Sequence, residues 1–508
     1  MWDAIVIGSG IGGLAAAAAL GKRGRKVLLL EQHNVAGGQT QTFHRQDWVF
    51  ATGVHYIGGV GPQSGEAGQF GRLLVWLSDG SLQFAACANP YDIVRLPGFE
   101  FGIEHPEDAY RAGLRDRFPE EHAAIEGWFA ACAAARKSAF TLFALRSMPH
   151  WLAFGLRLLR GAQAEQWARR TLADELAKIA TPQLRAVLGA RWGDHGAPPA
   201  WAPFVEHALV TGSYNAGAYY PVGGPARFAQ TLLPTLRAAG GDIVLGADVQ
   251  RIELSGGHVS AVTYLQKGQL QRAQARHVIS AMGARNTAAA LPPDITETWH
   301  RNVEALKPGV GYIALYLGLE GDIAAAGASS ANHWIYESDD IGRLWHSPAD
   351  EDAPGLFVSF PSLKDPAWAG PPTCEVLALV DSAAFAPWLH PSPGADSGDY
   401  LAFKGWVGAR LRAQFGRHFP ALAPMVRFAE LATPLTQKRY VRTPDGAMYG
   451  LEMTGQRLTN AALKLRTPVD GLILAGQDVM GPGVEAAFMS GLMAAASIEP
   501  GLWREFGR

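Results

Sequence analysis

The chain has 508 residues, of which 48% are apolar and only 18% are charged. This composition provides enough apolar material for more than one hydrophobic core and excludes a largely disordered protein. The 44 basic and 46 acidic residues give a formal net charge of -2, so the sequence offers no general argument for binding nucleic acid. Cys87, Cys132 and Cys374 are too few and too widely spaced to predict a disulfide framework or a metal site.

The first apolar segment differs from a secretory signal, because it is a short strand-like run that ends in a glycine loop. No run of about eighteen consecutive apolar residues predicts a membrane-spanning helix. We therefore expect a cytoplasmic protein that is either soluble or bound to the surface of a membrane.

Residues 1–31 have the pattern of a complete nucleotide-binding βαβ unit. Residues 3–7 and 26–30 are apolar runs that predict strands, and the Ala-rich residues 13–20 predict the helix between them. The intervening loop has the G-x-G-x-x-G spacing, which allows a tight turn, close approach of the backbone to a pyrophosphate and close packing of helix on strand. The helix N-terminus adds free N–H groups and a partial positive charge for the phosphates. The loop residues that we expect to hold the cofactor are Gly8, Gly10, Ile11, Gly12 and Gly13.

Glu31 closes the second strand, where a carboxylate can bind ribose hydroxyls. The neighbouring Gln32 is also expected to contact the cofactor. The charge of Glu31 would repel a 2′-phosphate. The alternative is an ordinary Gly-rich turn at the start of a domain. Strand, helix, second strand and acid in the correct order favour dinucleotide binding instead.

Two glycines after this unit favour FAD over a nicotinamide as the tightly bound cofactor. Gly37 and Gly38 fall where a flavoprotein folds its chain back past the phosphates, since backbone without side chains can come that close. Gln39 and Thr40 follow directly and are expected beside the cofactor.

The glycine-flanked turn at residues 52–58 carries Val54, His55 and Tyr56. We expect this turn to lie beside the flavin ring, with Val54 and His55 in contact with the cofactor, because loops often carry functional residues. The alternative is a hairpin with a half-buried aromatic residue.

Residues 212–290 predict a return to the cofactor domain. Strands at residues 248–254 and 259–265 are joined by a Gly256-Gly257 hairpin. Val249 is placed where its backbone amide could pair with the adenine.

The C-terminal segment predicts a third return. A buried strand at residues 471–475 leads into a glycine loop and a helix of small residues. We expect Gly476 and Asp478 to contact the ribityl–pyrophosphate region. The helix that begins after Gly483, near Val484, would aim its positive end at the N1/O2 edge of the ring and stabilise the charge of the reduced flavin. A nicotinamide dehydrogenase has no need of such a return.

Two excursions separate these parts. Residues 62–211 are expected to be mainly helical, whereas residues 291–467 hold strand-like runs at 312–318 and 375–380 and a polar, turn-rich patch at 433–450 that we expect to face a cavity. The predicted helical patches of the first excursion are residues 109–113, 122–135 and 171–188.

Residues 136–160 combine apolar and aromatic residues with five cations and no acid, and Pro149 interrupts them. A helix pair lying in a membrane interface has this composition. A core helix pair with solvated arginines is equally compatible with it.

The sequence thus predicts an α/β protein. A Rossmann-type FAD-binding domain of the glutathione reductase and amine oxidase kind is interleaved with an α+β substrate domain that carries a mixed sheet and helices. The FAD domain is assigned residues 1–61, 212–290 and 468–508, and the substrate or membrane-facing domain residues 62–211 and 291–467.

These motifs together resemble the retinol saturase branch of the phytoene desaturase and carotenoid isomerase family, and the resemblance covers essentially the whole chain. The matching features are residues 8–13, Glu31, residues 37–38, 52–58, 220–224, 360–368, 449–450 and 476–478. The resemblance implies bound FAD, action on C=C or C–C bonds of long apolar polyenes and collection of these substrates from membranes. Gln39 and Thr40 depart from the small or Cys residues of the family pattern, which leaves the exact reaction and substrate open.

Such chemistry asks little of acid–base groups, because a hydride moves between flavin N5 and carbon. The candidates for orienting substrate or passing the accompanying proton are His55, Tyr56, Tyr220 and Tyr440. Packing of these rings against their neighbours is the alternative role for each.

No second G-x-G-x-x-G follows a strand and opens a helix, so we expect a diffusible electron donor or acceptor such as NAD(P)H, a quinone or oxygen. The sequence favours a saturase-like enzyme acting on a lipophilic polyene, isoprenoid or acyl chain. It leaves desaturation and cis–trans isomerisation open, since all three share one geometry. A flavin amine oxidase and a non-catalytic flavin- or lipid-binding protein are the rival functions.

Overall fold

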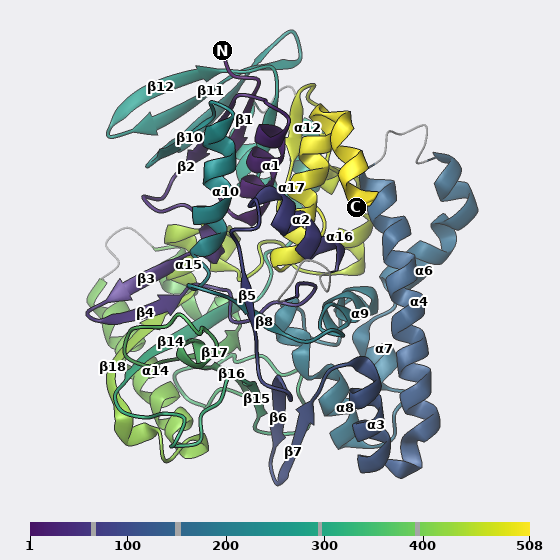
Figure 1. Cartoon of the computed structure of the whole chain (residues 1–508), viewed down its shortest axis with the longest axis vertical. Coiled ribbons are helices and arrows are strands. Elements are labelled where there is room, and N and C mark those ends of the chain that lie inside the picture. The colour runs from purple at the N-terminus through teal and green to yellow at the C-terminus, as the bar shows by residue number, and fades with distance from the viewer. Residues whose placement is uncertain (62–67, 148–153, 293–296, 392–396, 508) are drawn as a thin grey trace.

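The structure is a computed structural model that describes residues 1–61, 68–147, 154–292, 297–391 and 397–507. Figure 1 shows a parallel sheet with its helices at one end of the molecule, a larger sheet at the other end and the long helix α4 along one side.

Three distant parts of the chain build one parallel sheet, in the order β19-β13-β1-β2-β9. Its strands are β1 (Ala4–Ile7), β2 (Val27–Glu31), β9 (Asp242–Leu245), β13 (Val278–Ser280) and β19 (Leu472–Leu474). Ile5 lies opposite Leu28 on one side and Val278 on the other. All but β9 are buried along their whole length, as expected for a parallel sheet covered on both faces. The strands predicted around the glycine loop and near the C-terminus are confirmed.

Helix α1 (Ile11–Lys22) is packed between α10 (Arg227–Ala238) and α17 (Val484–Ile498) and is buried from its first residue to Gly21. Its small side chains let the neighbouring backbones approach closely. A Cβ atom on Gly491 of α17 would lie 2.0 Å from the carbonyl oxygen of Gly12, and one on Gly21 would lie 3.0 Å from that of Thr235. The Ala-rich sequence is therefore required by packing on two sides.

A three-stranded antiparallel sheet follows β9 in the chain and confirms the hairpin predicted at Gly256-Gly257. It consists of β10 (Asp248–Ser255), β11 (His258–Gln266) and β12 (Gln269–Gln274).

The larger sheet has seven strands in the order β18-β14-β17-β16-β15-β6-β7, with β15 and β6 parallel and the other pairs antiparallel. The strands are β6 (Asp92–Leu96), β7 (Phe99–Ile103), β14 (Gly311–Leu319), β15 (Asn332–Tyr336), β16 (Gly355–Ser359), β17 (Thr373–Val380) and β18 (Val426–Ala432). The predicted strands at 312–318 and 375–380 are confirmed within β14 and β17.

The expectation that residues 62–211 are mainly helical missed β6 and β7. The buried positions of β6 alternate, but one of them is taken by Asp92 rather than by an apolar residue, which obscures the strand pattern. The helix expected at 171–188 is two helices, because Pro182 starts a new one after a break. The helices of this region are α2 (Gln69–Leu77), α3 (Glu107–Arg117), α4 (His122–Ser147), α6 (Ala162–Arg169), α7 (Leu172–Leu176), α8 (Pro182–Gly189) and α9 (Phe204–Ser213).

Short elements complete the fold. The small strands are β3 (Thr42–Arg45), β4 (Trp48–Ala51), β5 (Phe84–Ala86) and β8 (Tyr219–Pro221). The remaining α-helices among the described residues are α11 (Ala284–Ala289), α12 (Glu297–Glu304), α13 (Ala386–Leu389), α14 (Ser397–His418), α15 (Pro434–Tyr440) and α16 (Gly455–Thr459). Part of the patch predicted as turns at 433–450 is thus helical, since Thr433 and Thr436 form a capping box that starts α15. No helix in the described ranges is both long and apolar enough to cross a membrane.

The crossing of α1 and α17 gives a stability prediction. Gly491→Ala should lower the free energy of unfolding by about 1–3 kcal/mol, because the added methyl group overlaps the backbone of α1. The control is Gly127→Ala in α4, where a Cβ atom meets nothing within 4 Å and the higher helix propensity of alanine should stabilise by about 1 kcal/mol. Urea midpoints of the two variants check this, and equal midpoints would contradict the close crossing.

Candidate functional site

A cavity of about 1480 Å³ extends from the carboxyl ends of the parallel strands to the seven-stranded sheet. Pockets for single small ligands usually measure about 300–1,000 Å³, so this cavity has room for a cofactor and a second molecule. One end is lined by backbone of the glycine loops, and the other by aromatic and aliphatic side chains.

The glycine loop between β1 and α1 lines the first end. Gly8 has a φ of +92°, and a Cβ atom on Gly13 would lie 1.9 Å from the carbonyl oxygen of Gly8, so the turn and the packing both require glycine. Gly10 is different. Its φ of -57° suits any residue, and a Cβ atom there would meet nothing within 4 Å. The space that Gly10 leaves open belongs to the cavity and faces the N-terminus of α1, which has no side-chain cap and no acid in its first turn.

Glu31 and the second glycine pair hold this loop in place. The Glu31 carboxylate accepts hydrogen bonds from the Ser9 N–H at 2.8 Å and the Ser9 hydroxyl at 2.6 Å, and it also lines the cavity. Gly37 donates its N–H to the Ser9 hydroxyl and does not itself line the cavity. A Cβ atom on Gly38 would lie 2.9 Å from the Cα atom of Gly10, so the two loops touch where phosphates would lie.

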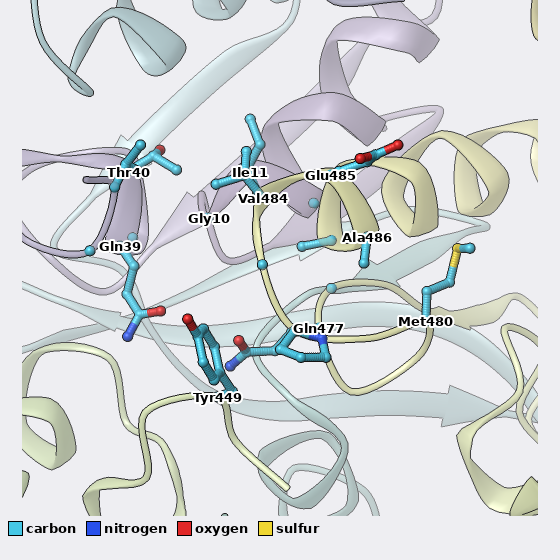
Figure 2. A pocket seen from close by; sticks show the side chains of 18 of the residues that line it. Gly10, Ile11, Gln39, Thr40, Tyr449, Gln477, Met480, Val484, Glu485 and Ala486 are labelled. Carbon is cyan, nitrogen blue, oxygen red and sulfur yellow. The ribbon is translucent and has the colours of Figure 1, made fainter. Parts of the chain in front are cut away.

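The start of helix α17 faces the same space. Figure 2 shows Val484, Glu485 and Ala486 of its first turn, and these residues line the same cavity as Gln39, Tyr449 and Gln477. The N-cap residue Gly483 has a φ of +89° and provides no side-chain cap, so the N–H groups of this turn are available to a ligand. Burial raises the pKa of Glu485 to about 7, and no sequence motif had singled out this residue.

The cofactor residues expected from sequence mostly line one cavity. Those that do are Gly8, Gly10, Ile11, Gly12, Glu31, Gln32, Gly38, Gln39, Thr40, Val54, His55, Val249, Gly476, Gly483 and Val484. The structure places Gly13, Gly37 and Asp478 behind this surface.

Asp478, for which we expected a contact with the ribityl–pyrophosphate region, does not line the cavity. The side chain is buried, and its carboxylate accepts the Ala284 N–H at 2.9 Å and the Leu451 N–H at 3.3 Å. These bonds fix two backbone segments behind the cavity, whose wall at this point is formed by Gly476 and Gln477.

The four candidate catalytic residues are not brought together. His55 and Tyr56 line the middle of the cavity. Tyr440 also lines it, but its backbone oxygen accepts a hydrogen bond from Gln32 at 2.7 Å, which places it at the nucleotide end. Tyr220 is buried in β8 outside the cavity wall, where burial raises the pKa of its hydroxyl. Of these candidates, Tyr220 is thus the one that does not line the cavity.

His55 is held by a partner that sequence analysis missed. Its Nδ1 lies 2.6 Å from Oε2 of Glu375, and Oε1 of Glu375 accepts the Ala51 N–H at 2.7 Å. An ionised carboxylate can only accept, so with Glu375 ionised Nδ1 is the donor, and the contact fixes the orientation of the ring. Glu375 is fully buried within the apolar strand β17, and a lone acid in such a strand was the available signal.

Tyr56 belongs to a buried polar cluster. Its hydroxyl donates to Oδ2 of Asp194 at 2.8 Å and lies 3.3 Å from Oδ2 of Asp92. Lys364, from the segment that supported the resemblance, donates to the backbone oxygen of His55 at 2.8 Å. Burial lowers the pKa of Lys364 and raises that of Tyr56.

Comparisons with known proteins agree with this geometry. A family model described as an NAD(P)-binding Rossmann-like domain matches residues 6–70. The all-trans-retinol 13,14-reductase of Rattus norvegicus is 32% identical over 524 residues, which cover 98% of this chain and 85% of that protein. The chain belongs to the retinol saturase branch of the phytoene desaturase and carotenoid isomerase family.

Two further matches to this retinol saturase-like protein have lower sequence identity. A chloroplastic prolycopene isomerase of Arabidopsis thaliana is 25% identical and covers 97% of the chain and 82% of its own length. The structure of cyclohexylamine oxidase from Brevibacterium oxydans IH-35A aligns with a TM-score of 0.63 at 19% identity, over 99% of this chain and 100% of that one. The structural likeness establishes the amine oxidase type of Rossmann fold. The retinol saturase-like protein is an FAD-dependent oxidoreductase.

The residues present fit FAD. An uncapped helix N-terminus beside the open space at Gly10 suits the pyrophosphate, and a second one at Val484 suits the ring. Glu31 lies at the end of β2, where its carboxylate suits the ribose hydroxyls.

The open space at Gly10 allows a test of FAD binding at this site. Gly10→Val should leave the stability of the apo-protein nearly unchanged, because no protein atom lies within 4 Å of a Cβ atom there, but should weaken FAD binding about tenfold or more. Titration of apo-protein with FAD measures this. The control Gly405→Val in α14, where a Cβ atom also meets nothing within 4 Å, should bind FAD normally. Normal FAD affinity in Gly10→Val would place the pyrophosphate elsewhere.

Proposed function

We propose that this protein saturates a C=C bond of a lipophilic polyene, with hydride transfer at flavin N5. The retinoid, carotenoid, isoprenoid and unsaturated acyl chains are the candidate substrate classes. The observation that carries the proposal is that one cavity joins the dinucleotide end to an apolar end built on the seven-stranded sheet.

The apolar end suits a long hydrocarbon chain. Strands β14 to β17 form one wall of it, and the side chains that they contribute are Tyr312, Trp334, Tyr336, Leu356, Phe357, Leu377 and Leu379. Burial of a hydrocarbon chain there would contribute about 0.8 kcal/mol for each CH₂ group removed from water. The rat relative is named for a reduction of all-trans-retinol, an apolar polyene alcohol, which favours saturation over the other directions.

Bound FAD would supply the hydride chemistry. The N-terminus of α17 would stabilise negative charge on the ring, and the aromatic wall would exclude water and hold the chain flat. His55, fixed by Glu375, is the group that we assign to orienting the substrate or passing its proton. The electron donor or acceptor is diffusible, and NAD(P)H, a quinone and oxygen are the candidates.

The decisive experiment uses FAD-loaded protein reduced under anaerobic conditions and then mixed with all-trans-retinol or a carotenoid. Saturation reoxidises the flavin and yields a product that has gained two hydrogens by mass spectrometry. Oxidised protein that yields a product lacking two hydrogens would indicate desaturation. An unchanged mass with altered retention time would indicate isomerisation. Turnover of amines alone would favour the amine oxidase, and reduced flavin unchanged by every ligand would favour a binding role.

In that assay His55→Ala should lower the turnover number by about 10²-fold, because a positioned proton-transfer group contributes at least this much. FAD content should stay unchanged. The control His258→Ala removes an exposed histidine and should have no effect. Full activity of His55→Ala would remove His55 from the reacting centre.

Contact with a membrane through residues 136–160 is part of the proposal. Phe140, Phe154, Leu158 and Leu159 are exposed, with fractions from 64% to 85%. Phe140 also lines the cavity, so a lipid-facing patch would lie where an apolar substrate could enter. Pro149 lies outside the described residues.

Replacing Phe140, Leu158 and Leu159 together by serine should abolish co-sedimentation with vesicles of mixed zwitterionic and anionic lipid, because the apolar anchor is lost. FAD content should persist. The matched control replaces Leu270 and Leu401, exposed to 69% and 63% elsewhere on the surface, by serine and should sediment like the parent. Unchanged sedimentation of the triple variant would contradict the membrane contact.

A further inference from the structure

Asp194 places a carboxyl group in the apolar end of the cavity. Asp194 closes the 3-10 helix Ala190–Asp194 and lines the cavity beside Trp192 and Gly193. Trp334 and Phe357 line the same region from the sheet. Such a wall needs no acid to hold a pure hydrocarbon.

The position of Asp194 is fixed from two sides. The Tyr56 hydroxyl donates to its Oδ2 at 2.8 Å, and the Tyr56 ring stacks on Tyr214 with centroids 4.6 Å apart. Two residues after Asp194, a Cβ atom on Gly196 would lie 2.6 Å from the Tyr449 ring, which Figure 2 shows beside Gln477. The segment that carries Asp194 therefore also packs against Tyr449, which lines the cavity together with Gln477.

The two acids next to Tyr56, Asp92 and Asp194, differ in whether a nearby cation balances their negative charge. Asp92 is fully buried, lies 3.8 Å from the Arg191 guanidinium and accepts from Asn332 at 3.2 Å. Asp194 has no cation within ion-pair distance among the described residues. Burial and the charge of Asp92 raise the pKa of Asp194 to about 7, so the neutral acid, which can donate a hydrogen bond, is well populated at neutral pH.

We propose that Asp194 hydrogen-bonds a neutral oxygen, a hydroxyl or a carbonyl, at one end of an otherwise apolar substrate and thereby sets the orientation of the chain. This inference rests on the proposed function and makes it specific. Asp194 acts on binding and orientation, while the reacting carbons lie along the chain at the flavin.

A neutral oxygen fits this cluster better than a charged group. An ammonium group would lose its hydration among the aromatic side chains of this wall, and Asp194, whose raised pKa favours the neutral acid, would compensate that charge only in part. A carboxylate ligand would add negative charge beside Asp92 and Asp194. A hydroxyl or carbonyl needs only the hydrogen bond that Asp194 can make.

The test compares three ligands of one shape on the FAD-loaded protein: all-trans-retinol, its deoxy hydrocarbon and the corresponding amine. The change in polyene fluorescence on binding gives each dissociation constant. The parent protein should bind the alcohol about tenfold more tightly than the hydrocarbon. Tighter binding of the amine than of the alcohol, or no binding of any ligand, would overturn the proposal.

Two variants separate a specific contact from a structural role. Asp194→Leu should abolish the preference for alcohol over hydrocarbon, and Asp194→Asn, whose amide can donate and accept, should restore most of it. Asp92 remains 3.3 Å from the Tyr56 hydroxyl in both, so that hydroxyl keeps a partner. Equal weakening of both ligands, with the preference kept, would show that Asp194 only supports the fold. FAD content and reoxidation of the reduced flavin by the hydrocarbon test the proposed function separately.

Discussion

The structure depends on the close approach of helices α1 and α17. Gly12 and Gly491 let the two backbones meet at a distance that no Cβ atom would allow. This contact brings an N-terminal helix start and a C-terminal helix start to the same edge of the parallel sheet. Two uncapped sets of N–H groups then face one cavity, which is the arrangement that a molecule with a pyrophosphate and an electron-accepting ring requires.

The second feature is the contrast between the two ends of this cavity. The nucleotide end is made of backbone and a few polar side chains, and its loops are fixed to each other through Ser9 and Glu31. The far end is made of rings and aliphatic side chains on β-strands, which are rigid supports. A flavin between them would face polar groups along its nucleotide and a water-poor space above its ring, so that hydride transfer to carbon would be protected from solvent.

Sequence analysis succeeded where the signal was local. The glycine spacing, the Ala-rich helix and the acid at the end of β2 lie within the first thirty-one residues, and each has a mechanical reason that needs no knowledge of the rest of the fold. The resemblance to the retinol saturase branch rested on motifs spread along the chain, and the match over 98% of it confirmed that assignment.

The contacts that sequence analysis missed are long-range. His55 meets Glu375 across 320 positions, and Tyr56 meets Asp194 across 138, so no local pattern relates these pairs. Asp478 was expected at the cofactor because it lies in the glycine loop after the last strand. In the folded chain its carboxylate instead accepts hydrogen bonds from two backbone amides. Tyr440 and Tyr220 had the right chemistry for a reacting centre, but their places in α15 and β8 could be learned only from the tertiary structure.

The stoichiometry and affinity of FAD binding test the central claim most directly, namely that three separated segments of the chain form one flavin site. The account predicts a yellow protein that holds one FAD per chain and that, once stripped, takes up FAD again with recovery of the flavin absorbance. A colourless protein that takes up no FAD on reconstitution would contradict it.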